Sequence, residues 1–328
     1  MLPIALVIIA LFALLPAVAS ADGLPAVGID ARPLSIPGGE TEFVTKSGKR
    51  STRLIEEARY GGVVRERRIA GPFSLPAVAY DGSPGGLSAD GRTLVLISPR
   101  TRYPRKRTTF AVVDTRSLRV RSHIGLKGDF SFDAISPDGR LMYLVEYDRR
   151  NFGEYDVRAY DIRARHLFAK PVVDPREPDE EMYGIPVTRA TSADGRWAYT
   201  LYDSAEHPFV HAIDTSGRTA VCIDLDDLPN AWGATLDLRG PRLDVVGQAG
   251  RVLARIDTRT HRVVEPRAGR AAGAGAEDTG ISWLLLAAPT AALLLLLAAA
   301  GTLALRRRRS EPITEVWEAS SDQHAPTA

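Results

Sequence analysis

The sequence predicts an all-β fold in which one short antiparallel sheet is repeated several times. Three observations support this: a turn motif recurs along the chain, apolar β-rich runs flank each copy, and the array lies between two apolar terminal segments. The glycines of the recurring turn stand at positions 91, 139, 195 and 240, which gives spacings of 48, 56 and 45 residues. Periods of this length indicate a repeat architecture in which each unit is one supersecondary element.

The first element is an apolar N-terminal segment, residues 2–18, followed by small residues that suit proteolytic cleavage. We interpret residues 1–21 as a signal peptide and residues 22–40 as a linker. No Lys or Arg precedes the apolar run, so an uncleaved anchor is the alternative. Under either interpretation the middle of the chain is exported.

The repeat itself has the order Ser-x-Asp-Gly-Arg, an apolar run, and a second apolar run that ends in Asp. Asp-Gly favours a tight turn, because Gly takes a positive φ at little cost and Asp accepts hydrogen bonds from nearby backbone. We expect one short strand before this turn and three after it. The turn residues of the three clear copies are Asp90 and Gly91, Asp138 and Gly139, and Asp194 and Gly195. The second aspartates, including that of a degenerate fourth copy around Gly240, are Asp114, Asp161, Asp214 and Asp257.

A four-stranded sheet of this kind cannot bury both of its faces alone, whereas sheets stacked around an axis can. We therefore predict a β-propeller over residues 41–266, with five blades and with four or six as the alternatives. Residues 41–71 would supply a degenerate first blade. A curved open sheet or a sandwich is the other fold that regularly spaced short strands indicate.

The motif order also resembles the bacterial surface-layer type (Tyr-Val-Thr-Asn, or YVTN) β-propeller repeats and their WD40-like relatives. The resemblance covers residues 76–265 and, more loosely, residues 41–75. In place of the name-giving Tyr-Val-Thr-Asn strand, the chain has Leu-Val-Leu-Ile, Met-Tyr-Leu-Val and Ala-Tyr-Thr-Leu. The resemblance therefore implies the propeller fold and no particular subfamily or function.

The C-terminal elements predict a membrane anchor. Residues 267–280 form a Gly/Ala-rich stalk, and residues 281–305 are an uncharged segment long enough to cross a bilayer as a helix. Arginines beside a span mark its cytoplasmic side, so the tail at residues 306–328 is cytoplasmic and the β domain is extracytoplasmic. We thus predict a single-pass protein of the cell membrane. The arginines that set this topology are Arg306, Arg307, Arg308 and Arg309.

Composition narrows the function classes. The 42 basic and 40 acidic residues leave a net charge of +2, which argues against a nucleic-acid partner. Cys222, the one cysteine, is predicted to be a small core residue. The repeated aspartates stand where turns favour Asp, and His207 and His211 belong to no metal-binding motif, so we expect neither a metal nor a cofactor.

Two groups of residues are candidates for partner binding. The basic segment 100–107 interrupts a repeat and is predicted to protrude, either as an anion or partner contact or as a solvated loop. Aromatic residues in the connectors that lead into each first strand are candidates for the axial face, where they either bind a ligand or close the channel. The candidates are Arg100, Arg102, Arg105, Lys106 and Arg107 in the basic segment, and Phe132, Tyr183 and Trp232 in the connectors.

No motif for a nucleophile or a phosphate loop is present in the sequence. The leading hypothesis is a non-enzymatic module that binds a protein or an envelope ligand outside the cytoplasm. The alternative is an exported propeller enzyme, a hydrolase, lyase or lactonase-like protein with an axial-face active site. A sensor that signals through the short tail is the third hypothesis.

Overall fold

The computed structural model describes residues 31–35, 38–101, 103–147, 155–179, 182–204 and 207–264. These residues form five antiparallel sheets and no helix. Sheet 1 contains β1 (Thr41–Ser47), β2 (Ser51–Ala58) and β3 (Val63–Ala70), and sheet 2 contains β4 (Thr93–Ile97), β5 (Arg107–Asp114) and β6 (Arg119–Lys127). Sheet 3 contains β7 (Phe130–Ile135), β8 (Leu141–Tyr147), β9 (Tyr155–Asp161) and β10 (His166–Pro171). Sheet 4 contains β11 (Ile185–Thr191), β12 (Trp197–Asp203), β13 (Phe209–Asp214) and β14 (Thr219–Asp224). Sheet 5 contains β15 (Thr235–Arg239), β16 (Arg242–Val246), β17 (Val252–Asp257) and β18 (Arg262–Val264).

Sheets 3, 4 and 5 have the predicted order of one strand before the recurring turn and three after it. Consecutive strands are hydrogen-bonded neighbours in every sheet. Sheet 1 has three strands, including β2, which the sequence analysis had not singled out. Phe132 lies within β7, so its predicted place in a connector was wrong. Its strand is fully buried because it packs between neighbouring sheets.

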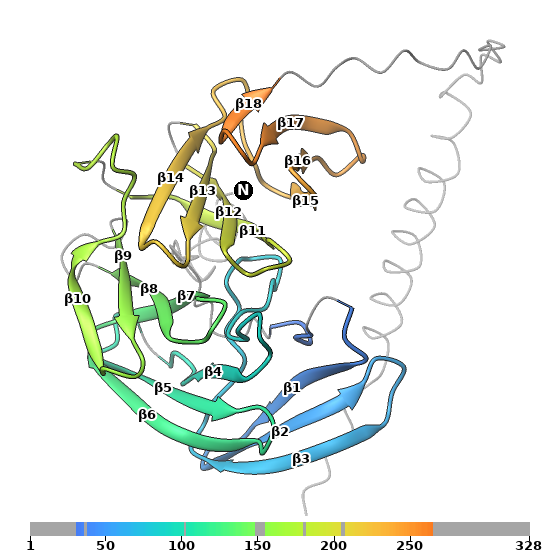
Figure 1. The fold of residues 1–328 in the computed structure, drawn as a ribbon, viewed down its shortest axis with the longest axis vertical. Coiled ribbons are helices and arrows are strands. Elements are labelled where there is room, and N and C mark those ends of the chain that lie inside the picture. Colours follow the sequence, from blue (N-terminus) through green and yellow to red (C-terminus); the bar gives the residue numbers. More distant parts are fainter. Residues whose placement is uncertain are drawn as a thin grey trace, which may run out of the picture. The chain divides into compact units, whose positions relative to one another are not determined.

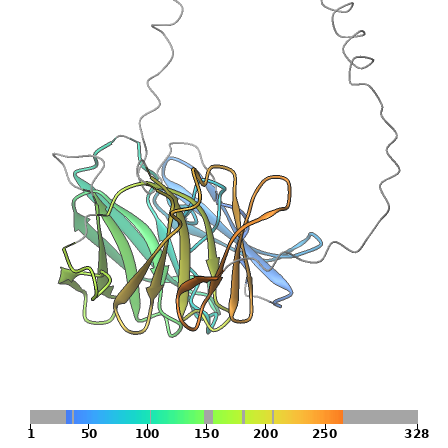
Figure 2. The same ribbon diagram turned by 90° about the horizontal axis from the view of Figure 1, so that it is seen from above.

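The sheets pack face to face in chain order, and alternate residues of one strand contact opposite neighbours. Leu94 and Leu96 of β4 pack against sheet 1, whereas Val95 between them packs against sheet 3. In the same way Tyr143 packs against sheet 4, and Tyr199 packs against sheet 5. Figure 1 shows the sheets following one another around a common centre, and Figure 2 shows their turns at about one level at one end. The described residues thus have an all-β, propeller-like arrangement.

Sheet 2 lacks the predicted strand before its recurring turn. Ser74 and Leu87 each form a single bridge to β4, and the residues between them leave the sheet. We call residues 75–86 the axial loop. Its proline and glycine content explains the departure, because Pro cannot donate to a ladder and Gly weakens a strand. The backbone N–H groups of Tyr80 and Asp81 donate to the carbonyls of Pro186 (2.9 Å) and Val187 (3.2 Å), so the axial loop reaches β11 in sheet 4.

The recurring motif stabilises the turns themselves. The Ser136 hydroxyl donates to Asp138 Oδ1 (2.6 Å), which also accepts the Arg140 N–H (3.0 Å), and Ser136 Oγ accepts the Leu141 N–H (2.9 Å). The second aspartate caps the turn between the last two strands of its sheet. Asp214, for example, accepts the N–H groups of Ser216 and Gly217. The motif aspartates are therefore turn caps, and the described residues contain no group of three or more His, Cys, Asp or Glu that could hold a metal ion.

The predicted signal peptide, transmembrane segment and cytoplasmic tail lie outside the described residues. Within the part of the chain that the structure describes, no helix is long and apolar enough to span a membrane.

Candidate functional site

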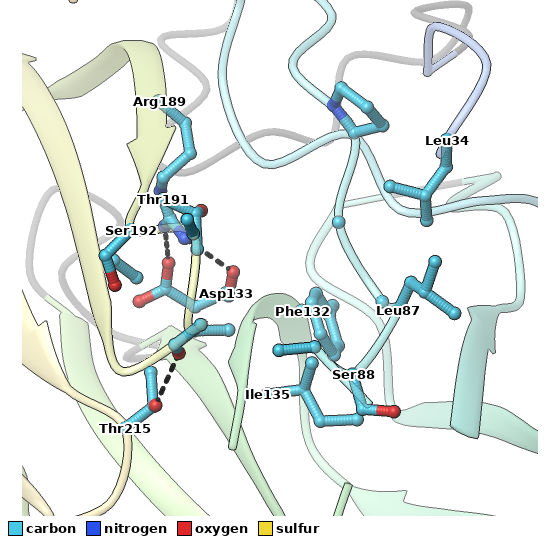
Figure 3. A pocket seen from close by; sticks show the side chains of 18 of the residues that line it. Leu34, Leu87, Ser88, Phe132, Asp133, Ile135, Arg189, Thr191, Ser192 and Thr215 are labelled. Atoms are coloured by element: carbon cyan, nitrogen blue, oxygen red, sulfur yellow. Dashed lines mark hydrogen bonds and ion pairs between the residues drawn. The ribbon is translucent and has the colours of Figure 1, made fainter. Parts of the chain in front are cut away.

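A pocket of about 260 Å³, which we call the axial pocket, lies where the axial loop, β7 of sheet 3 and the beginning of sheet 4 meet. Figure 3 shows side chains from these elements around the pocket. Most of the lining is apolar or small, and several hydroxyl groups are interspersed. The lining includes Leu34, Gly85, Leu87, Ser88, Ala89, Phe132, Asp133, Ile135, Arg189, Ser192, Ala193 and Thr215.

One wall of the pocket carries a buried ion pair between sheets 3 and 4. The Arg189 guanidinium on β11 donates to the Asp133 carboxylate and to its backbone carbonyl (2.9 Å). The two side chains are only 5% and 3% exposed. In Figure 3 the two residues face each other beside Thr191. A buried pair of this kind adds no net charge to the pocket, so the pocket suits a ligand without net charge.

The opposite wall is apolar and depends on a close approach of the axial loop. Phe132 is buried and packs beside Gly85. A Cβ atom at Gly85 would lie 2.7 Å from Val78 and 3.0 Å from Phe132. Only glycine therefore lets the axial loop lie directly against the Phe132 ring.

The floor of the pocket is formed by two recurring turns that belong to sheets 2 and 4. Gly195 has φ +71°, and a Cβ atom at this position would lie 2.6 Å from the Cβ of Ala89. The Thr215 hydroxyl donates to the Gly195 carbonyl (2.8 Å), which fixes the second turn (Figure 3). Turns of two sheets that are not neighbours in the chain thus meet and close the pocket at this end.

Behind the ion pair, a row of polar side chains crosses sheet 4. Arg189, Thr200, His211 and Cys222 are direct partners on β11 to β14, so their side chains share one face of the sheet. Burial lowers the pKa of His211 to about 4, with a smaller opposing effect of the Asp133 carboxylate. Neither ring nitrogen of His211 has a hydrogen-bond partner within the described part of the chain. The imidazole is therefore neutral at pH 7 and lies in the packed interface between sheets 3 and 4.

The structure corrects the prediction of a protruding basic loop. Arg100 and Arg105 are buried, and both donate to the Asp129 carboxylate, which is itself 0% exposed in its side chain. Because an unpaired buried charge is costly, the two guanidinium groups fold inward around this carboxylate. Lys106 and Arg107 remain exposed, and Arg102 lies outside the described residues.

The three connector candidates lie in different environments. Phe132 lines the pocket. Trp232 is 56% exposed, and its ring centroid lies 5.8 Å from that of Tyr80 in the axial loop. Tyr183 is half-buried just before β11 and does not line the pocket.

Arg189, Leu87 and the axial loop belong to the site but were not predicted from the sequence. The segment from Leu75 to Gly86 contains two prolines and three glycines. This composition was a usable signal, because it predicts a departure from the regular strand. No sequence pattern pairs Arg189 with Asp133, since they are 56 residues apart.

Comparisons with known proteins give structural likeness only. No protein-family model matches the chain, and no curated protein matches it in sequence. The chain resembles TolB from Acinetobacter baumannii, with 17% identity, a TM-score of 0.40, and coverage of 67% of this chain and 51% of TolB. It resembles the Cps50 (Swd1) β-propeller domain from Myceliophteria thermophila, with 12% identity, a TM-score of 0.40, and coverage of 70% and 64%. It also resembles a prolyl endopeptidase, with 14% identity, a TM-score of 0.41, and coverage of 76% of this chain and 36% of the endopeptidase.

The chain thus spans about half of TolB and about a third of the endopeptidase. Because the similarities are low, we assign the architecture from strand order and packing rather than from these proteins.

Proposed function

We propose that this chain is a non-enzymatic binding module, a five-bladed propeller of the YVTN or WD40-like type held outside the cytoplasm by one C-terminal membrane span. Each of the five sheets would be one blade. The ligand would be a segment of a protein or an envelope component that places a small, uncharged group in the axial pocket. The chain would thus display a binding site at the cell surface.

The observation that carries this proposal is the lining of the axial pocket. Its apolar wall around Phe132 favours an apolar group, and its hydroxyl groups can orient that group through hydrogen bonds. Asp133 Oδ1 accepts the Arg189 guanidinium, whereas Asp133 Oδ2 and Arg189 Nε are buried without a hydrogen-bond partner among the described residues. The two charges neutralise each other, and the two remaining atoms can accept from and donate to a neutral group of a ligand. This favours binding over the enzymatic alternative, in which charged groups would converge on a substrate.

The experiment is crosslinking and mass spectrometry with the full-length chain in membranes. Ala193, an exposed residue of the pocket lining, is replaced by Trp to fill the pocket without changing the core. We expect wild type to crosslink to a saturable partner and A193W to lose it. The matched control is Thr260→Trp, which adds the same ring on an exposed turn of sheet 5.

Equal capture by wild type and A193W would refute the axial pocket as the binding site. Turnover of a small molecule that A193W abolishes would instead support the exported enzyme. Lys106→Gln with Arg107→Gln tests the exposed part of the basic segment in the same assay, and we expect no loss of the partner.

A further inference from the structure

A second open volume lies between sheets 4 and 5, at the end of the molecule that carries the recurring turns. This groove has a volume of about 400 Å³. Its centre is aromatic, and its rim carries both a carboxylate and guanidinium groups. It shares only Ser192 with the axial pocket, so the Ser192–Arg196 turn separates the two.

The aromatic part of the groove consists of three rings. Trp197, the first residue of β12, has its ring centroid 4.4 Å from that of His261 and 6.2 Å from that of Tyr199. The Tyr199 ring is stacked at 18° on Trp197, and the His261 ring is tilted by 51°. Burial raises the pKa of Tyr199 to about 12, so its hydroxyl stays protonated. Trp197 and His261 are half-buried and line the groove with flat, largely apolar surface, while the buried Tyr199 ring supports Trp197 from within.

The repeat provides an internal comparison for these rings. The residue that begins the strand after the recurring turn is Thr93 in sheet 2, Leu141 in sheet 3 and Arg242 in sheet 5. The residue with positive φ in the last turn is Leu118 in sheet 2, Arg165 in sheet 3 and Arg218 in sheet 4. The equivalent groove between sheets 3 and 4 contains Leu141 and Arg218. Within the described residues, only the groove between sheets 4 and 5 has aromatic side chains at both positions, namely Trp197 and His261. The fold therefore does not require the pair.

The charges at the rim are balanced. Arg196 is paired with Asp214 (2.9 Å), and its guanidinium carbon lies 5.8 Å from the Trp197 ring centroid. Asp194 is an ionised carboxylate, because a hydrogen bond from the Ser192 hydroxyl lowers its pKa. Arg259 is exposed and has no ion pair among the described residues. One free guanidinium thus offsets one carboxylate, and the groove as a whole favours neither an anion nor a cation.

We propose that this groove binds a neutral saccharide ring. The C–H face of a sugar is apolar and flat, so it suits the surface of Trp197 and His261. Sugar hydroxyls are donors and acceptors at once, so they can pair with the Asp194 carboxylate and the Arg259 guanidinium together. His261 belongs to the groove lining, and its buried Nε2 atom has no hydrogen-bond partner within the described part of the chain. This site is independent of the axial pocket and does not rest on the function proposed for it.

The test is saturation-transfer NMR with the full-length chain in a detergent that has no sugar headgroup. The probes are glucose, galactose, mannose, N-acetylglucosamine and their β-linked disaccharides. We expect at least one probe to give saturable transfer in the millimolar range, a range typical of a single shallow subsite. Trp197→Leu and His261→Arg introduce the residues that neighbouring sheets hold at the same positions, so both variants are compatible with the fold. Each should weaken binding by about tenfold or more.

Phe168→Leu is the matched control, since it removes an aromatic ring from the groove between sheets 3 and 4. It should leave saccharide binding unchanged. The proposal is overturned if no probe gives saturable transfer, or if binding persists in both W197L and H261R. If W197L is unstable, H261R decides the test on its own, provided that its Tm equals that of wild type.

Discussion

In the cluster of Arg100, Arg105 and Asp129, a single carboxylate pairs with two buried guanidinium groups. Asp129 accepts the Arg100 and Arg105 side chains and also the Arg105 N–H (2.7 Å). Burial lowers the pKa of Arg105, as expected for a cation held away from water. Removing the partner of a buried charge costs about 3–5 kcal/mol.

We therefore expect Asp129→Asn to lower the free energy of unfolding by about 3 kcal/mol in urea denaturation. The control is Asp237→Asn, which breaks the exposed pair with Arg239 and should change stability little. Similar effects of the two substitutions would show that the cluster does not stabilise the fold.

His211 makes a second prediction at the scale of one residue. Its pKa falls from 6.5 to about 4 because burial disfavours the charged imidazole. Between these values the unfolded chain binds a proton that the folded chain does not, so stability declines as pH falls through this window, by about 3 kcal/mol in total. His211→Met removes this proton linkage. The stability of the variant relative to wild type should therefore rise steadily from pH 7 to pH 4, as measured by urea denaturation at each pH.

Exposed His166 provides the comparison for His211. His166→Met makes the same replacement at an exposed position and controls for the effect of the methionine side chain itself. A parallel pH dependence of wild type and H211M would mean that His211 gains a proton in the folded protein.

At the scale of the elements, the last turn of sheets 2 to 5 places a non-glycine residue at positive φ. The four residues are Leu118, Arg165, Arg218 and His261, with φ between 53° and 58°. A side chain in this region costs about 1–2 kcal/mol, and glycine avoids that cost but loses more entropy on folding. We expect Arg165→Gly to raise the free energy of unfolding by about 0.5 kcal/mol. Arg163→Gly, in the same turn but without a positive φ, should lower it, and thermal unfolding of both variants is the measurement.

The elements also show what the sequence could predict. The strands around each recurring turn were predictable because Asp, Gly and the apolar alternation act locally. The axial loop was not, since its course depends on hydrogen bonds from Tyr80 and Asp81 to β11, about a hundred residues later. The same holds for the candidate site. Phe132 was identifiable as an aromatic group near a first strand, whereas the partner of Asp133 and the burial of Arg100 are set by tertiary packing.

At the scale of the whole molecule, the recurring turns of sheets 2 and 4 touch although sheet 3 lies between them in the chain. Gly195→Ala adds a Cβ atom 2.6 Å from Ala89 at a position with φ +71°. Both effects should lower the free energy of unfolding, by about 2–3 kcal/mol together.

Gly250→Ala is the control for backbone strain alone, because it has φ +74° and nothing within 4 Å. Adding Ala89→Gly should then restore part of the loss in G195A but none in G250A. A coupling energy of about 0.5–1.5 kcal/mol in the double-mutant cycle would demonstrate the contact that closes the axial pocket. If G195A and G250A lose equal stability and show no coupling to A89G, the two turns do not meet, and the pocket is open at this end.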